Sequence, residues 1–197
     1  MHKKMVLFFI LTTFLIADDT AFVRNAYFKS YAYEKEKKYA SAIQSLEKLY
    51  QKYPKGYTLN LRIGYLYFLL KKYDISIRYY KKSSRILPKS NESKLGLTRV
   101  YLAKKDFKKA QRLAFGMLKT DYYSFYGNLY AIQALVGQKK YKIALAIANK
   151  MLAIFPTNIT YLEQLALLYK KTNHQYLDSV YESIYILDPE NSLLKNR

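Results

Sequence analysis

The sequence predicts an all-α fold, a right-handed α-solenoid of about five helix–turn–helix repeats that follows an N-terminal signal segment. Between Tyr57 and Leu70, apolar residues recur every three or four positions, which is typical of one face of an α-helix. A second amphipathic pattern begins at Tyr73 and ends before Pro88, because the residue before a proline is disfavoured in the helical region. Together the two patterns form one helix–turn–helix unit.

This unit recurs along the chain with a spacing of 34 residues. Large apolar side chains repeat at Tyr33, Tyr67, Tyr101, Leu135 and Tyr169, and again at Tyr39, Tyr73, Phe107 and Tyr141. Small side chains repeat at Ala42, Ser76, Ala110 and Ala144. One unit cannot bury its own apolar faces, so neighbouring units must stack, and the small residues would let the second helix of each repeat approach its neighbours closely.

The motif Gly64, Tyr67, Tyr73, Ser76 and Pro88 resembles the tetratricopeptide repeat in order and spacing. The resemblance covers residues 23 to 189 and implies an exported bacterial member of that family. Two features depart from its pattern: the turn between the helices mostly carries a lysine pair in place of Gly-Asp, and the early tryptophan is replaced by Ala26, Asn60, Lys94, Asn128 and Leu162. The resemblance therefore implies an architecture and names no ligand.

Residues 1–17 have the pattern of a signal peptide, with lysines at positions 3 and 4, a mostly apolar stretch from 5 to 16, and Ala17 before a cleavage point. The alternative is that this segment remains uncleaved and anchors the chain. In both cases we expect an exported protein, periplasmic or anchored facing the periplasm. A short segment, 18–22, leads into an array at 23–190, whose repeats are 23–56, 57–90, 91–124, 125–158 and 159–190, and residues 191–197 form a tail. Pro189 follows Pro156 by 33 residues, and we place the lost residue near Asn173 and His174.

The residue inventory argues against an enzyme. The chain has no cysteine, which excludes disulfides, thiolate metal sites and cysteine nucleophiles. His174 is the one histidine outside the signal segment, and it has no set of catalytic partners in the sequence. The six glycines form no phosphate-binding loop. We therefore expect no catalytic residue, no cofactor and no metal site.

A stacked array of this family has a concave face, lined by the first helix of each repeat, that can bind an extended peptide or a helix. The resemblance places these residues on it: Tyr27, Tyr31, Leu61, Tyr65, Phe68, Leu95, Arg99, Leu129 and Gln133. The alternative is that some of them pack against one another. Residues such as Tyr31 and Arg62 do not reproduce the family's clamp for a chaperone carboxylate, which disfavours that partner.

A second candidate surface comes from lysines at the turn inside each repeat. They are Lys37, Lys38, Lys71, Lys72, Lys104, Lys105, Lys139, Lys140, Lys170 and Lys171. With a net charge of +20, a basic edge of this kind would attract a membrane surface, an acidic polysaccharide or an acidic protein. The alternative is that the lysines reflect only a lysine-rich composition on solvated faces. Nucleic acid also suits the charge, but an exported protein rarely meets it.

The last helical pattern, with Tyr176, Val180, Tyr181, Ile184 and Tyr185, has no full capping helix after it. Terminal repeats normally need a polar outer face, so this end would dock on a partner or on another copy of the chain. Taken together, the sequence favours a non-enzymatic exported scaffold that assembles with another envelope protein. The alternative is an accessory factor that binds an anionic partner through its lysine-rich edge, as in polysaccharide export.

Overall fold

The computed structural model describes residues 2–196, and it contains no β-strand within that range. The chain divides into two compact units, residues 1–90 and 91–197, each a stack of paired helices. The all-helical repeat fold predicted from the sequence is confirmed. Across the part of the chain that the structure describes, no helix combines the length and the apolar character that crossing a membrane requires.

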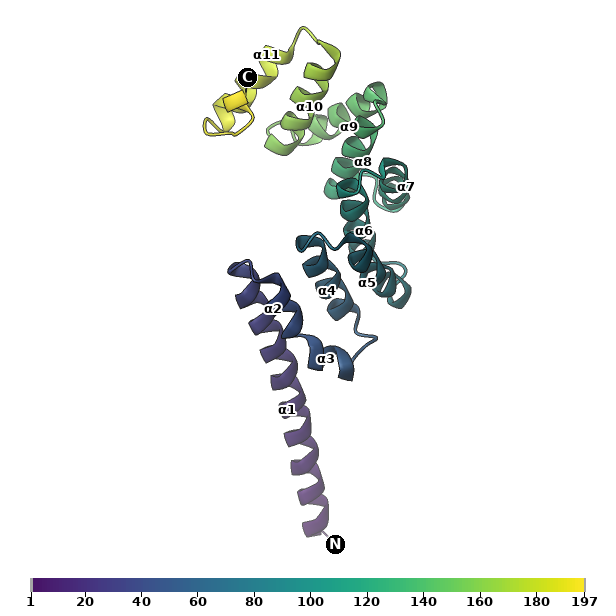
Figure 1. Cartoon of the computed structure of the whole chain (residues 1–197), viewed down its shortest axis with the longest axis vertical. Helices are drawn as coiled ribbons and strands as arrows, with labels where there is room; N and C mark the ends of the chain where they lie inside the picture. The colour runs from purple at the N-terminus through teal and green to yellow at the C-terminus, as the bar shows by residue number, and fades with distance from the viewer. Residues whose placement is uncertain (1, 197) are drawn as a thin grey trace. The chain divides into compact units, whose positions relative to one another are not determined.

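Unit 1 consists of α1 (His2–Lys35), α2 (Tyr39–Gln44), α3 (Glu47–Lys52), α4 (Tyr57–Leu69) and α5 (Tyr73–Ile86). Helix α1 packs on α2 and α3, α2 packs on α4, and α4 packs on α5. The N-terminal half of α1 extends past α2 and α3 (Figure 1). The predicted signal segment falls on this half of α1. The structure does not describe the side chains of residues 2–18, so the signal peptide stays a prediction.

The core of unit 1 forms where the first helix pair meets α4. Its buried apolar residues are Ala26, Ala42, Leu46, Leu49, Leu59, Ile63 and Leu66. Ser76, one of the predicted small residues, is fully buried, and its Oγ donates a hydrogen bond to the carbonyl of Gly64 at 2.7 Å. A Cβ at Gly64 would lie 3.2 Å from the ring of Tyr80. Small residues therefore bring α4 and α5 into close contact, as the sequence predicts.

The second helix of the first repeat is interrupted, which the sequence did not predict. Helix α2 ends at Gln44 and α3 begins at Glu47. Between them, the Ser45 hydroxyl donates to the carbonyl of Ala42 at 2.8 Å and to that of Ala26 at 3.5 Å. Serine side chains that bond nearby carbonyls compete with the helical pattern and bend helices. The result is a bend next to α1.

Unit 2 consists of α6 (Glu92–Ala103), α7 (Phe107–Leu118), α8 (Phe125–Gly137), α9 (Tyr141–Ile154), α10 (Ile159–Thr172), α11 (Leu177–Leu187) and the 3₁₀ turn η1 (Leu194–Asn196). Each helix packs on the next from α6 to α11, and the first helices α6, α8 and α10 also contact one another in sequence. Two core clusters result. One centres on Ala114, Met117, Ala131, Ile132, Leu135, Ala144, Ala148, Met151, Tyr161 and Leu168, and the other on Leu162, Leu165, Ala166, Val180, Tyr181 and Ile184.

The turns inside the repeats share one backbone geometry. A residue with positive φ stands at each of them, 34 residues apart: Lys37 (58°), Lys71 (58°), Lys105 (59°), Lys139 (60°) and Asn173 (50°). In the second repeat, the N–H of Lys71 bonds the carbonyl of Phe68 at 2.9 Å and the N–H of Lys72 bonds that of Tyr67 at 2.9 Å. This pair of bonds is the Schellman motif, which usually places glycine at the left-handed position. Here lysine occupies it four times.

The register slip in the last repeat lies after Asn173. That residue keeps the 34-residue step from Lys139. Tyr181 and Ile184, by contrast, are buried 33 residues after Ala148 and Met151, which are also buried. One residue is therefore missing between Asn173 and Tyr181, in the turn and first residues that lead into α11.

Candidate functional site

In unit 1 the candidate binding surface begins with two tyrosines one helical turn apart on α1. The rings of Tyr27 and Tyr31 lie 6.4 Å apart, and Tyr31 is 49% exposed. The hydroxyl of Tyr27 is hydrogen-bonded to the hydroxyl of Thr58 on α4 at 3.2 Å. Burial raises the pKa of Tyr27 above its ordinary value. This contact joins the first helices of two successive repeats.

Arg62 on α4 holds Tyr31 in place. Its guanidinium lies 4.0 Å from the centre of the Tyr31 ring, its Nε donates to Ser30 Oγ at 3.1 Å, and its Nη1 pairs with Glu34. Arg62 is buried, so its guanidinium is largely desolvated, whereas Glu34 and Tyr31 remain partly exposed. A cation against an aromatic face stabilises the ring, and more so when the cation is desolvated. Tyr31 is therefore a surface aromatic with a fixed orientation.

The other predicted groove residues of unit 1 lie on α4. Leu61 and Tyr65 are half-buried, and they lie one helical turn apart. Phe68 is also half-buried, but its ring lies 6.0 Å from that of Tyr73 at the start of α5. Phe68 therefore packs within its own helix pair, and Tyr31 is the exposed aromatic residue among those predicted for the groove of unit 1.

Unit 2 joins the same two positions of the repeat with the residue types exchanged and by a hydrogen bond in place of the ring contact. Arg99 on α6 occupies the register of Tyr31, two periods later, and Tyr130 on α8 occupies the register of Arg62. The Nε of Arg99 donates to the Tyr130 hydroxyl at 3.2 Å. An arginine and a tyrosine thus connect successive first helices in both units. Tyr130 was not among the residues predicted from the sequence, although its spacing from Arg62 could have indicated it.

The remaining predicted groove residues of unit 2 differ in exposure. Leu95 and Gln133 are half-buried, whereas Leu129 is only 7% exposed and belongs to the core. Tyr126, which the sequence analysis missed, is half exposed on α8, with its ring 6.0 Å from that of Tyr130. In unit 2 the aromatic surface therefore centres on Tyr126, and Leu129 contributes packing.

All ten lysines of the predicted basic edge are exposed. Lys38 forms an ion pair with Glu36 at 2.7 Å, which raises the pKa of Lys38. Lys140 donates a hydrogen bond to Gln111 Oε1 at 3.3 Å. Eight of these lysines stand at the turns of the Schellman motifs, whereas Lys170 and Lys171 lie in the last turn of α10, before the left-handed Asn173, and not in the turn as predicted. Each unit therefore presents a positively charged edge.

Within the described part of the chain, the structure brings together no set of side chains of the kind that a metal needs. Among the described residues, no group of three His, Asp or Glu side chains could hold a metal ion. The ring of His174 stacks on Tyr169 at 3.9 Å, and its Nδ1 accepts a hydrogen bond from the N–H of Tyr176 at 3.3 Å. His174 therefore stabilises the turn before α11, where the register slip lies.

Comparisons with known proteins identify the fold. No protein-family model and no curated protein matches the sequence. Among solved structures, MamA from Desulfovibrio magneticus RS-1 superposes with a TM-score of 0.72 at 14% identity, covering 83% of this chain and 93% of that one. MamA AMB-1 gives 0.65 at 17% identity, covering 90% and 97%.

YrrB, described as a tetratricopeptide-repeat protein with an unusual peptide-binding site, gives a TM-score of 0.65 at 11% identity, covering 85% of this chain and 87% of YrrB. At these identities the comparisons establish the fold and no more. The chain has the fold of tetratricopeptide-repeat proteins, which agrees with the resemblance in its sequence.

Proposed function

We propose that the protein is a non-enzymatic scaffold that binds a segment of another protein on the aromatic surface of its first helices. The observation that carries this proposal is the geometry of Tyr31, a half-exposed ring whose orientation is held by Arg62 at 4.0 Å. A tyrosine that is already ordered offers a large contact area at a low cost in conformational entropy. YrrB, which shares the fold, is described as having a peptide-binding site, which supports this class of partner.

The form of the partner follows from the surface. Tyr27, Tyr31 and Tyr65 combine ring faces with hydroxyl groups, so they suit a segment that presents both apolar side chains and backbone polar groups. The surface lies on helices, and a rigid helix face loses little conformational entropy on binding because its backbone is already ordered. We therefore propose a peptide or helix of another protein as the partner.

Peptide selection from a displayed library, followed by calorimetric titration, tests this function. Tyr31→Ala should weaken binding of the selected peptides about tenfold, since a central aromatic anchor typically contributes at least 1 kcal/mol. Tyr123→Ala is the matched control, because Tyr123 is comparably exposed at 56% but lies in the loop before α8. Equal effects of the two substitutions would refute the assignment of the surface.

We also propose that this scaffold acts outside the cytoplasm, in the cell envelope. Support comes from the sequence of residues 1–17, with its early lysines, its apolar stretch and a small residue before the cleavage point. Fusion of alkaline phosphatase after residue 22 should give an active enzyme in a Gram-negative host, and mass spectrometry should find a mature chain that begins near Asp18. An inactive fusion would place the chain in the cytoplasm and refute the proposal.

A second candidate function is binding of an anionic surface or polymer through the lysine edge. The observation that favours it is the exposure of all ten lysines at or next to the turns inside the repeats, in a chain whose net charge is +20. Binding to anionic liposomes or to an acidic polysaccharide should then exceed binding to neutral ones and fall as salt is added. Charge reversal at Lys170 and Lys171 should weaken it more than the same change at Lys108 and Lys142, which are exposed on second helices.

A further inference from the structure

Lys29 on α1 occupies a register that is buried in all the other repeats. Its counterparts at steps of 34 residues are Ile63, Leu97, Ala131 and Leu165, and each is less than 9% exposed. Ile63 packs with residues of α2 and α3, Ala131 with residues of α7, and Leu165 with residues of α9. In each case the shared core cluster includes residues from the second helix of the preceding repeat. Lys29 is exposed at the position where such a helix would pack.

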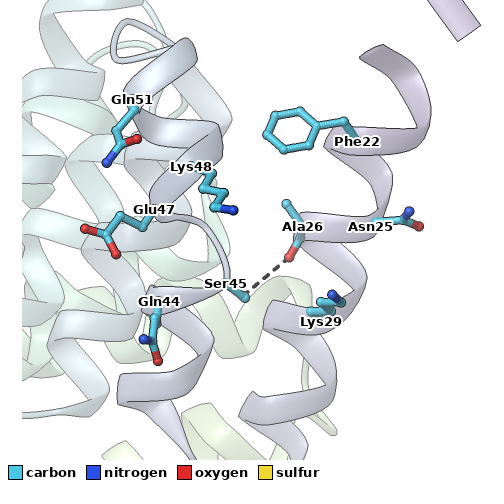
Figure 2. Close-up of a pocket in the computed structure, with 9 residues that line it drawn as sticks. All are labelled: Phe22, Asn25, Ala26, Lys29, Gln44, Ser45, Glu47, Lys48 and Gln51. Atoms are coloured by element: carbon cyan, nitrogen blue, oxygen red, sulfur yellow. Dashed lines mark hydrogen bonds between the residues drawn. The ribbon is translucent and has the colours of Figure 1, made fainter. Parts of the chain in front are cut away.

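A cleft of about 640 Å³ marks this position on unit 1. Its lining comes from α1 on one side and from the α2–α3 segment on the other, with no residue from α4 or α5. Figure 2 shows Phe22 and Lys48 directed into the space between the two walls. The bend at Ser45 forms part of the second wall. The charged residues that line the cleft are Lys29, Lys48 and Glu47, so its net charge is positive, and Phe22 and Ala26 give it an apolar part.

The outer face of α11 has the opposite charge. Residues 177–190 contain four acidic residues and no basic residue, in a chain with 34 basic and 14 acidic residues. Asp178, Glu182, Tyr185 and Ile186 are exposed, and their spacing places them on one face of the helix. Ile186 is 70% exposed. This face combines carboxylates with two large apolar side chains.

The repeat register relates this acidic face to Lys29. Because the last repeat is one residue short, Asp178 and Tyr185 are the counterparts of Leu145 and Leu152 on α9, 33 residues earlier. Both leucines pack against the cluster that contains Leu165. Inside unit 2, the junction between repeats is therefore apolar, with leucine on each side. In the last and the first repeat, the same two positions hold Asp178 and Lys29.

A second pair of repeat positions also relates α11 to the cleft, and it rests on a different contact. In unit 1, Lys82 on α5 donates a hydrogen bond to the Tyr50 hydroxyl on α3 at 2.6 Å, and its Nζ lies 4.8 Å from the centre of that ring. The counterpart of Lys82 in the first repeat is Lys48, which lines the cleft, and the counterpart of Tyr50 in the last repeat is Tyr185. The ends of the chain thus carry both halves of a contact that the structure already forms between repeats.

We propose that the protein associates head to tail, with α11 of one copy packed in the cleft between α1 and the α2–α3 segment of a second copy. Asp178 of the first copy pairs with Lys29 of the second, and Tyr185 meets Lys48. In this junction α11, the second helix of the last repeat, packs on α1, the first helix of the first repeat of the next copy, as second and first helices pack between successive repeats inside the chain. Because the two surfaces differ, the contact is heterologous, and it forms open chains of copies or closed rings.

Sedimentation velocity of the full-length chain at low ionic strength tests this proposal. The weight-average sedimentation coefficient should rise with protein concentration and fall when salt is added. Lys29→Glu and Asp178→Lys should each weaken association about tenfold or more, because each places like charges opposite one another. An equimolar mixture of the two variants should associate again, since every head then finds a tail of opposite charge. Lys108→Glu, the same charge change at an exposed position on α7, should associate as the wild type does.

Three outcomes would overturn the proposal. The first is a wild-type chain that stays monomeric at every concentration. The second is association that persists unchanged in both single variants, which would assign it to another surface such as the apolar segment near the N-terminus. The third is a mixture of the two variants that stays dissociated. Peptide binding at Tyr31 is measured separately by calorimetric titration, so a failure of head-to-tail association does not count against peptide binding, and the reverse also holds.

Discussion

Replacing Lys71 with glycine should stabilise the protein, although it removes a side chain. Lys71 has a φ of 58° and occupies the left-handed position of the turn between α4 and α5. The Cβ of an L-residue is crowded there by the following carbonyl, whereas glycine has no Cβ. The lysine side chain is exposed, so its loss removes little packing.

The magnitude follows from two opposing terms. The left-handed conformation costs a non-glycine residue about 1–2 kcal/mol. Glycine gives back about 0.5–1 kcal/mol, because it loses more backbone entropy on folding. The difference between the two terms ranges from about 0 to 1.5 kcal/mol in the free energy of unfolding, and its midpoint is a gain of about 0.8 kcal/mol. For a chain of this length, that corresponds to a rise of about 1–4 °C in Tm.

Two variants separate the backbone effect from the loss of a charge. Lys71→Ala removes the positive charge and keeps the Cβ, so the crowding remains. Lys72→Gly makes the same exchange one residue later, where φ is −83° and glycine relieves nothing. Urea denaturation followed by circular dichroism should show Lys71→Gly more stable than the wild type, with neither control matching it. If Lys71→Ala stabilises as much as Lys71→Gly, charge repulsion rather than backbone geometry is the cause, and the reasoning fails.

Three further substitutions test packing, each by thermal denaturation. Gly137→Ala should lower Tm, because a Cβ at that position would lie 2.4 Å from the ring of Phe107, and an unchanged Tm would show that the ring moves aside freely. Ala110→Phe should cost about 1–3 kcal/mol, since Ala110 is fully buried and the added ring overpacks the helix contact. Tyr161→Phe should cost about 1 kcal/mol, because the Tyr161 hydroxyl donates to the carbonyl of Phe125 at 2.7 Å. Burial also raises the pKa of Tyr161, so the hydroxyl stays protonated to a higher pH in the folded state than in the unfolded chain. The free energy of unfolding should therefore fall as the pH rises above about 10, and it should fall less in Tyr161→Phe.

The groove shows how far the sequence could predict the candidate surface. The 34-residue period places Tyr31 and Leu129 on the first helices of their repeats. Because side-chain direction on a helix follows from local geometry, the sequence also predicts which face of the helix each side chain is on. Whether each side chain reaches solvent depends on what stacks beside it. Tyr31 is 49% exposed, and Leu129 is 7% exposed within the core of unit 2. The 34-residue period could have marked Arg99 and Tyr130 as counterparts of Tyr31 and Arg62, but their hydrogen bond required the structure, since the two residues are 31 positions apart.

The sequence by itself determined the period of 34 residues, the two helices of each repeat, the small residues between them and the lysines at the turns. These are local properties, set by the spacing of apolar side chains and by the residues that end a helix. Only the tertiary structure decided that the turn lysines adopt a left-handed backbone and that α2 and α3 are separate helices. The opposite charges of Lys29 and Asp178 also became meaningful only when burial in the other repeats showed which registers form the junctions. Burial depends on neighbours distant in sequence, and a local pattern contains no information about them.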